Sequence, residues 1–305
     1  MTKERIEEAI SKARAFQAEA IVGIGGGKAI DTAKCVTSEL EVPLIAIPTS
    51  ASTDAPTIAM AIIYNDRHEH EDVYYFSKNP DMVLIDSSVI AKAPVRFLVS
   101  GMGDALATAF EARTTMAMDS NNYICQESGS YRRTRTAEII AEECLRTIMQ
   151  NGRLAKLANE NGIVTEPLEA VIEANTLMSG LGFENVGCAA AHCICNGLSS
   201  LPGGDNALHG EKVAFGVICQ LLAEHAPVKE IEEVIQFNLS VGLPVTLKDM
   251  GIETNEETYE KIAGDPDRTE WQREPFYTNA RIVADIVKCA DELGKMYAGR
   301  ASLDT

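Results

Sequence analysis

The chain has 305 residues, of which 46% are hydrophobic and 24% charged. This length suits one large or two ordinary globular domains with enough apolar residues for a core, and no stretch approaches the roughly 18 apolar residues that a membrane span needs. Lysines and arginines number 27 against 45 aspartates and glutamates, which gives a formal net charge of −18. We therefore expect the surface to repel nucleic acid and anionic lipid. A small neutral ligand fits this charge better.

The N-terminus and the cysteines indicate a cytoplasmic protein. Ile6, Ile10, Ala13 and Phe16 recur at helical spacing within a charged segment, which is not the apolar core of a signal peptide. Eight cysteines spread through a chain of this length are typical of reduced thiols in an intracellular protein.

The first hundred residues alternate helical and strand-like patterns, whereas the rest is mostly helical in periodicity. In chain order the segments are a helix at 3–17, an apolar run at 18–25, a helix at 27–38, and extended segments at 42–50, 58–66 and 73–86. The alternation predicts an α/β region with parallel strands up to about residue 97, followed by a larger helical domain.

A strand ending in consecutive glycines leads into a helix in the segment IVGIGGGKAIDTAK, residues 21–34. Glycines let backbone N–H groups approach a ligand, and a helix begins with its positive dipole end at the same point. The segment therefore suits a phosphate or pyrophosphate. Its spacing matches neither of the common nucleotide-binding patterns, so a tight turn without a ligand stays an equal alternative.

The next strand is expected to end at Pro48, and a polar loop follows it. It offers the carboxylate of Asp54 and four hydroxyl groups, those of Thr49, Ser50, Ser52 and Thr53. In an open α/β sheet, ligands bind just beyond the carboxyl ends of the strands, where this loop falls. The alternative is an ordinary capping loop, since serine, threonine and aspartate are common in turns.

The helical half carries one carboxylate and two imidazoles that suit a catalytic zinc with an open position. Asp104 is expected at the start of a helix, His192 in the middle of one, and His209 between a loop and the next helix. A core histidine and a helix cap are the alternatives for His192 and Asp104. Cys193 and Cys195 raise a thiolate site as a rival; only Cys195, three residues after His192, shares its helix face.

A longer pattern appears when the segments are taken together. In order they read GIGGGKAIDTAK, PTSASTDAPTIAM, KNPDMVLID, GMGDALATAFEAR, ANTLMSGLGFENVGCAAAH, NGLSSLP, HGEKVAFG and APVKEIE. This series resembles the glycerol dehydrogenases of the iron-containing (group III) alcohol dehydrogenase superfamily, from about residue 18 to about 250 and more loosely to the end.

The resemblance implies the dehydroquinate synthase-like fold. Residues 1–97 would form an α/β NAD-binding domain with a shortened parallel sheet, and residues 98–305 an all-helical metal domain, with the active site between them. By motif position, the zinc ligands would be Asp104, His192 and His209, and Asp54 would line the polyol pocket. The implied NAD contacts are Gly26, Gly27 and Lys28 along the pyrophosphate and Thr49, Ser52, Ile58, Met60 and Tyr64 at the nicotinamide half.

The implied activity is the NAD-dependent oxidation of glycerol to dihydroxyacetone, or of another 1,2-diol to the corresponding product. The resemblance also implies a homo-oligomer. Zinc would bind vicinal hydroxyls and lower the pKa of the one that is oxidised. Iron-using relatives carry a histidine at the position of Thr108, one turn after Asp104. A threonine leaves three protein ligands, which favours zinc over iron.

Departures from the family pattern keep alternatives open. Glycerol dehydrogenases carry a further α/β stretch before the glycines, so we expect weaker support for the adenosine side of NAD. Cys195 stands where the family often has histidine, and we expect it beside the metal ligands without binding the metal. The alternatives are an enzyme like glycerol-1-phosphate dehydrogenase, disfavoured because the loop around Asp54 lacks basic residues, and a non-catalytic relic with impaired cofactor binding.

Overall fold

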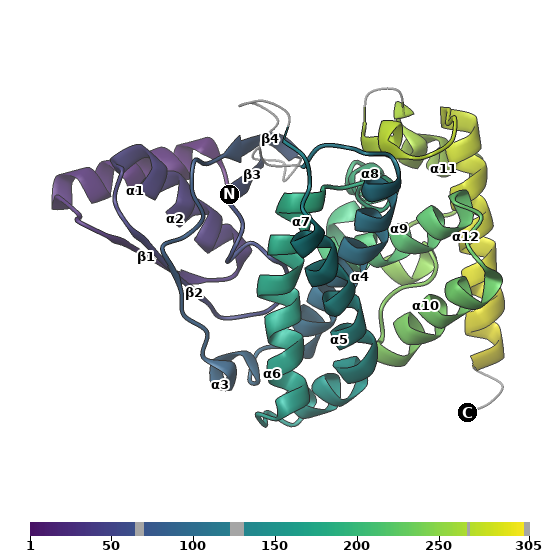
Figure 1. The fold of residues 1–305 in the computed structure, drawn as a ribbon, viewed down its shortest axis with the longest axis horizontal. Coiled ribbons are helices and arrows are strands. Elements are labelled where there is room, and N and C mark those ends of the chain that lie inside the picture. The colour runs from purple at the N-terminus through teal and green to yellow at the C-terminus, as the bar shows by residue number, and fades with distance from the viewer. Residues whose placement is uncertain (65–69, 123–130, 267–268, 302–305) are drawn as a thin grey trace.

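A computed structural model describes residues 1–64, 70–122, 131–266 and 269–301. The N-terminal α/β region lies at one end of the molecule and the last helices at the other (Figure 1). Its helices and strands are α1 (Lys3–Phe16), β1 (Ile21–Gly25), α2 (Gly27–Leu40), β2 (Leu44–Pro48), β3 (Met60–Tyr64), β4 (His70–Tyr75) and β5 (Met82–Val83). The predicted alternation of helices and strands is confirmed, but the expected extended segment at 73–86 is divided between the end of β4 and the short strand β5. The expected parallel pairing holds for β1, β2 and β5, whereas β3 and β4 pair antiparallel.

A small parallel sheet in the order β1-β2-β5 organises this region. Ile21 pairs with Leu44 and Gly25 with Pro48, so β1 and β2 end level with each other. Because both strands are parallel, the glycine turn after β1 and the polar loop after β2 leave the sheet at the same edge.

Helix α2 packs against β1 and β2 on one face of this sheet. Gly23 faces the helix so closely that a Cβ there would lie 2.7 Å from the Ala33 Cβ. On the other face, Val22 is 52% and Ile24 62% exposed among the described residues. Parallel sheets are usually covered on both faces. This apolar face, by contrast, is open in the part of the chain that the structure describes.

The hairpin of β3 and β4 forms a separate antiparallel sheet, with Met60 opposite Tyr75. Ala61 and Ile63 pack with Ile6 of α1 and Cys35 of α2 in a small core. The hairpin is thereby fixed against the helices of the N-terminal region.

The rest of the described chain is mostly helical. Its α-helices are α3 (Ser87–Ile90), α4 (Val95–Ala117), α5 (Arg135–Glu160), α6 (Glu166–Glu173), α7 (Ser179–Val186), α8 (Ala190–Ser199), α9 (His209–Ala223), α10 (Val228–Val241), α11 (Glu256–Ala263) and α12 (Ala280–Ala301). A π-helical turn, Ala174–Met178, joins α6 to α7. Helix α4 contacts α5, α7, α8 and α9, which surround it (Figure 1).

Two expectations about the helical half were wrong in detail. Asp104 lies in the middle of α4, which begins at Val95, and His192 lies in the first turn of α8. The division at residue 97, between the proposed domains 1–97 and 98–305, stays a prediction; the last strand ends at Val83.

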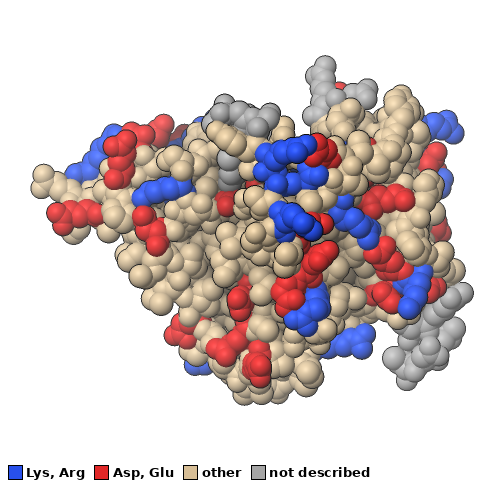
Figure 2. Space-filling model, viewed as in Figure 1, with Lys and Arg blue, Asp and Glu red and all other residues tan. Residues whose placement is uncertain are grey.

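Acidic and basic side chains are interspersed on the face shown in Figure 2. The absence of nucleic-acid binding stays a prediction. None of the helices in the described residues combines the length and apolar character that crossing a bilayer requires.

Helices α4 and α9 cross with their backbones in contact at two glycines. A Cβ on Gly103 would lie 2.2 Å from the Gly210 carbonyl oxygen, and one on Gly210 would lie 1.7 Å from the Ser100 carbonyl oxygen. No side chain fits at these distances. The crossing therefore brings the residues adjacent to these glycines, Asp104 and His209, against each other.

We expect Gly210→Ala to lower the free energy of unfolding by about 1–3 kcal/mol, because the added methyl group forces α4 and α9 apart. The midpoint of urea unfolding measures the effect. Gly299→Ala is the matched control, since among the described residues no atom outside its own helix backbone and chain neighbours lies within 4 Å of a Cβ built on that helical glycine; its stability should be unchanged or slightly increased. Equal effects of the two substitutions would contradict this view of the crossing.

Candidate active site

Asp104, His192 and His209 meet although they come from α4, α8 and α9. The Asp104 Oδ1 lies 3.2 Å from the His209 Nε2 and 3.6 Å from the His192 Nε2. One ligand atom from each residue falls within 4.8 Å of the others. A carboxylate oxygen and two imidazole nitrogens are the donors of a three-ligand catalytic zinc site.

The site is buried on the α4 side and open at His209. The side chain of Asp104 is 6% exposed, whereas that of His209 is 43% exposed. Burial opposes ionisation of Asp104, but the charges and hydrogen bonds of His209 and His192 lower its pKa below the ordinary value. The buried carboxylate therefore requires positive charge beside it.

The start of α9 is fixed by α4, which sets the position of His209. The Glu211 Oε2 accepts a hydrogen bond from the Leu208 backbone N–H at 2.7 Å, across the first turn of the helix. The other oxygen, Oε1, accepts from the Arg96 Nε at 2.6 Å. Arg96 lies on α4, so one carboxylate both caps α9 and ties it to the helix that carries Asp104.

Four side-chain hydrogen bonds fix the start of α8, which sets the position of His192. A helix leaves its first four backbone N–H groups without partners in the helix. In α8, Glu111 Oε1 accepts from Ala189 and His192, Glu274 Oε1 accepts from Ala190, and Gln220 Oε1 accepts from Ala191. All four donors are thus paired by residues from other segments.

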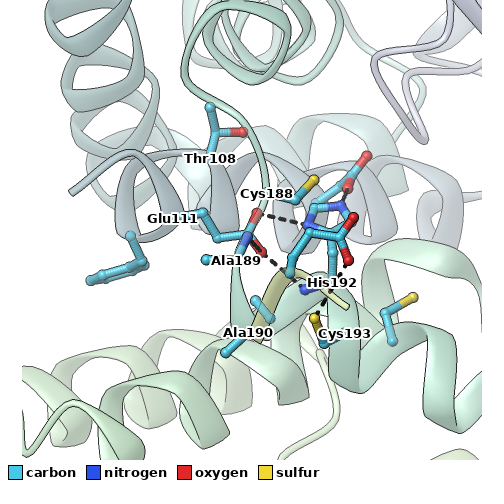
Figure 3. Close-up of polar contacts among 12 residues, drawn as sticks. Thr108, Glu111, Cys188, Ala189, Ala190, His192 and Cys193 are labelled. Carbon is cyan, nitrogen blue, oxygen red and sulfur yellow. Dashed lines mark hydrogen bonds and ion pairs between the residues drawn. The ribbon is translucent and has the colours of Figure 1, made fainter. Parts of the chain in front are cut away.

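Glu111 also contacts the His192 ring, as Figure 3 shows. Its Oε2 lies 2.7 Å from the His192 Nδ1. This residue was not predicted from the sequence. The only signal was its spacing, seven residues after Asp104, which puts two carboxylates on one face of α4.

Asp54 connects the polar loop to the helical half through hydroxyl groups. The Ser179 Oγ donates to the Asp54 Oδ2 at 3.3 Å, and the same Oγ lies 3.1 Å from the Thr108 Oγ1. Burial and the charge of Asp104 raise the pKa of Asp54 to about 7. Thr108 thus pairs with Ser179, a residue that was not predicted from the sequence.

The expected cofactor residues divide into two groups. Gly26 is the N-cap and Gly27 the first residue of α2, beside Ser50 and Thr53 of the polar loop. The Thr49 backbone N–H donates to the Gly25 carbonyl at 3.0 Å, which joins loop and turn. Lys28 is exposed, and Thr49 and Ser52 are half-buried.

The other expected cofactor residues lie further along the polar segment. Ile58 and Met60 are 7% and 5% exposed, so they are packed within the protein. The Met60 carbonyl accepts a hydrogen bond from the buried Lys34 Nζ at 2.8 Å. Tyr64 ends β3, and its side chain lies outside the described residues.

The two cysteines after His192 have different surroundings. The Cys195 Sγ lies 3.4 Å from the His209 Nδ1, on the opposite side of that ring from Asp104. The Cys193 Sγ lies 3.7 Å from the Glu270 Oε2. The seven cysteines in the described part of the chain are free thiols, and Cys125 lies outside it.

Comparisons with known proteins point to one family. Residues 1–87 match the family model of the iron-containing alcohol dehydrogenases. Over 98% of this chain and 81% of the relative, the sequence is 42% identical to a glycolaldehyde reductase of Halobacterium salinarum. It is 44% identical to a glycerol dehydrogenase of Thermotoga maritima over 92% of this chain and 76% of the relative.

A solved structure also matches nearly the whole fold. A probable glycerol dehydrogenase from Sinorhizobium meliloti superposes with a TM-score of 0.91 at 38% identity, over 97% of this chain and 82% of that one. The chain therefore belongs to the iron-containing alcohol dehydrogenase family. Within it, the resemblance to glycerol dehydrogenases drawn from the sequence motifs is confirmed.

Glu274 gives the start of α8 a pH dependence that a substitution can reveal. Burial and the nearby charge of Glu224 raise the pKa of Glu274 from 4.5 to about 8. Between these values the folded protein binds a proton that the unfolded chain has released, so the free energy of unfolding falls as pH rises. Glu274→Gln removes this loss while its amide oxygen can still accept from Ala190.

We therefore expect the melting temperature of Glu274→Gln, relative to that of the unsubstituted protein, to rise between pH 5 and pH 9. Thermal unfolding followed by circular dichroism at each pH measures the difference. A difference that stays constant, or that falls, over this range would contradict the assignment.

Proposed function

We propose that this chain oxidises glycerol, or a related 1,2-diol, to the corresponding ketone with NAD as the hydride acceptor and zinc as the metal. The observation that carries the proposal is the convergence of one carboxylate and two imidazoles on one point. Relatives at 42–44% identity that are named glycerol dehydrogenases support the same substrate class.

Asp104, His192 and His209 are the proposed metal ligands. Their oxygen and nitrogen donors suit zinc, which takes three protein ligands in catalytic sites. Thr108, one turn along α4, pairs with Ser179 and adds no ligand that iron would favour. When bound, zinc supplies a Lewis acid that lowers the pKa of a substrate hydroxyl.

The glycine turn is the proposed site of the NAD pyrophosphate. Helix α2 has 14 residues and begins at Gly27, with Gly26 as its N-cap. The backbone N–H groups at the start of such a helix favour anions. Thr49 stands beside this turn, and Ser52 contacts the neighbouring Ser50 in the same loop. The contacts of NAD with Lys28, Ile58, Met60 and Tyr64 stay predictions.

Asp54 is the residue we propose for binding the polyol. Its carboxyl is held by Ser179 at the junction of the polar loop and α7. The pKa of Asp54 is raised to about 7. The carboxyl group can therefore accept a hydrogen bond from a substrate hydroxyl when it is ionised. No lysine or arginine occurs between Thr49 and Thr57, which supports a neutral polyol over a phosphorylated one. Homo-oligomer formation and a cytoplasmic location stay predictions.

We expect the zinc-loaded protein to form NADH from NAD and glycerol, and a chelator to abolish the activity. Absorbance at the NADH band measures the rate. Added zinc should restore the chelated protein. A correctly metallated protein that is inactive on glycerol and 1,2-propanediol would contradict the proposal.

The same assay separates the competing activities. Faster turnover of glycerol 1-phosphate than of glycerol would favour the phosphorylated substrate, and faster turnover of glycolaldehyde with NADH would favour a reductase. Calorimetric titration with NAD tests the third alternative, since a non-catalytic relic would not bind NAD tightly.

Cys195→Ala should leave the zinc stoichiometry unchanged, whereas His192→Ala should abolish zinc binding. The reason is that Cys195 faces the Nδ1 of His209 and not the side of the ring that faces Asp104. Metal analysis of the purified variants measures the stoichiometry. Loss of zinc from Cys195→Ala would mean that the thiol is itself a ligand.

A further inference from the structure

Helix α4 holds the His192 ring between two buried carboxylates. Asp104 and Glu111 are seven residues apart, which is nearly two helical turns, so they share a face of the helix. The ring presents its Nε2 to the Asp104 Oδ1 at 3.6 Å and its Nδ1 to the Glu111 Oε2 at 2.7 Å. Glu111 is 1% exposed, so this contact is shielded from water.

Hydrogen-bond chemistry makes the two contacts unequal. An ionised carboxylate only accepts hydrogen bonds, and Glu111 accepts from two backbone N–H groups as well as from the ring. The proton of a neutral His192 ring therefore lies on Nδ1. The lone pair of Nε2 is then free and points toward Asp104 and His209.

We propose that Glu111 is a positioning residue, which holds His192 in the orientation and tautomer that bind the metal through Nε2. The inference rests on the proposed function, because it takes Asp104, His192 and His209 as the metal ligands. Glu111 itself touches neither substrate nor metal; it acts through the imidazole. Partners of this kind commonly change metal affinity ten- to a hundredfold when they are removed.

Two other roles for Glu111 fit the structure less well. Glu111, Cys188 and His192 have ligand atoms close enough for a second metal site. However, the oxygens of Glu111 already accept three hydrogen bonds, and burial raises the pKa of the Cys188 thiol to about 12, which disfavours the thiolate that a metal needs. The remaining alternative is that Glu111 serves only to cap α8.

The capping role can be separated because Glu274 caps the same helix without touching an imidazole. Glu274 Oε1 accepts from the Ala190 N–H at 3.0 Å. Glu274→Gln keeps an amide oxygen for that single donor. Glu111→Gln leaves one acceptor oxygen and one NH2 group for three donors. The NH2 group must face either the Nδ1 proton of His192 or the backbone N–H groups of Ala189 and His192.

The experiment compares Glu111→Gln with Glu274→Gln in the full-length protein. Zinc affinity is measured by competition with a chromophoric chelator, and cobalt-substituted protein gives the visible absorption spectrum of the metal site. We expect zinc to bind about ten- to a hundredfold more weakly to Glu111→Gln, with an altered cobalt spectrum. Glu274→Gln should match the unsubstituted protein within about twofold, since its effect on the helix start is the only change.

A second pair of variants covers the case in which Glu111→Gln does not fold. Glu111→Asp keeps the charge but withdraws the carboxylate by one methylene, so it cannot span the ring and the backbone together; Glu274→Asp is its control. Circular dichroism of the metal-free proteins establishes that each variant is folded. The aspartate pair should show the same difference in zinc affinity as the glutamine pair.

Failure of this inference and failure of the proposed function give different results. Equal zinc affinity and equal cobalt spectra in the Glu111 and Glu274 variants would overturn the positioning role, even in a protein that oxidises glycerol. A protein that loses zinc affinity only in the Glu111 variants but does not oxidise diols would support the role and overturn the proposed activity. An unsubstituted protein that binds neither zinc nor cobalt would overturn both.

Discussion

The buried polar residues of α4 each require a partner, and meeting this requirement determines how the helices around the site are arranged. A polar group that is removed from water without a hydrogen bond destabilises the folded state. Asp104, Thr108 and Glu111 occupy successive turns of α4 and are all buried. Asp104 meets His209 at the start of α9, Thr108 meets Ser179 in α7, and Glu111 pairs the N–H groups at the start of α8. One helix therefore positions three others, and with them the proposed metal ligands.

The same constraint joins the polar loop of the N-terminal region to the helical half. The buried Asn175 Nδ2, in the π-helical turn, donates to the carbonyls of Ala51 and Leu98 at 2.9 and 3.1 Å. The Thr57 Oγ1 donates to the Thr176 carbonyl of the same turn at 2.6 Å. Because these bonds are buried, the loop that carries Asp54 is fixed relative to α4. The proposed substrate residue and the proposed metal ligands are thus positioned by one hydrogen-bonded framework.

The sequence predicted the features that depend on local chemistry. The glycines after β1 and the alternation of apolar segments specify a strand-turn-helix without reference to distant residues. The position of Asp104 was wrong because Gly101 and Gly103 make the preceding segment resemble a break; in the structure both lie within α4 where other backbone or side-chain atoms approach closely. Gly187, with φ of 98°, ends α7 just before α8, so His192 falls in a first turn. Glu111 could not be assigned because its partners lie about 80 residues away.

The two imidazoles of the site are supported unequally. His192 has a buried carboxylate at its Nδ1, 2.7 Å away, and the charge makes that hydrogen bond strong. His209 has the thiol of Cys195 at its Nδ1, 3.4 Å away, and sulfur is a weak partner. His209 is also the more exposed ring, while its backbone is fixed by Glu211 and Arg96. Orientation of the His192 ring therefore depends strongly on the Glu111 carboxylate, whereas orientation of His209 depends mainly on where α9 begins. This difference explains why one substitution at Glu111 should affect metal binding strongly and one at Cys195 should not.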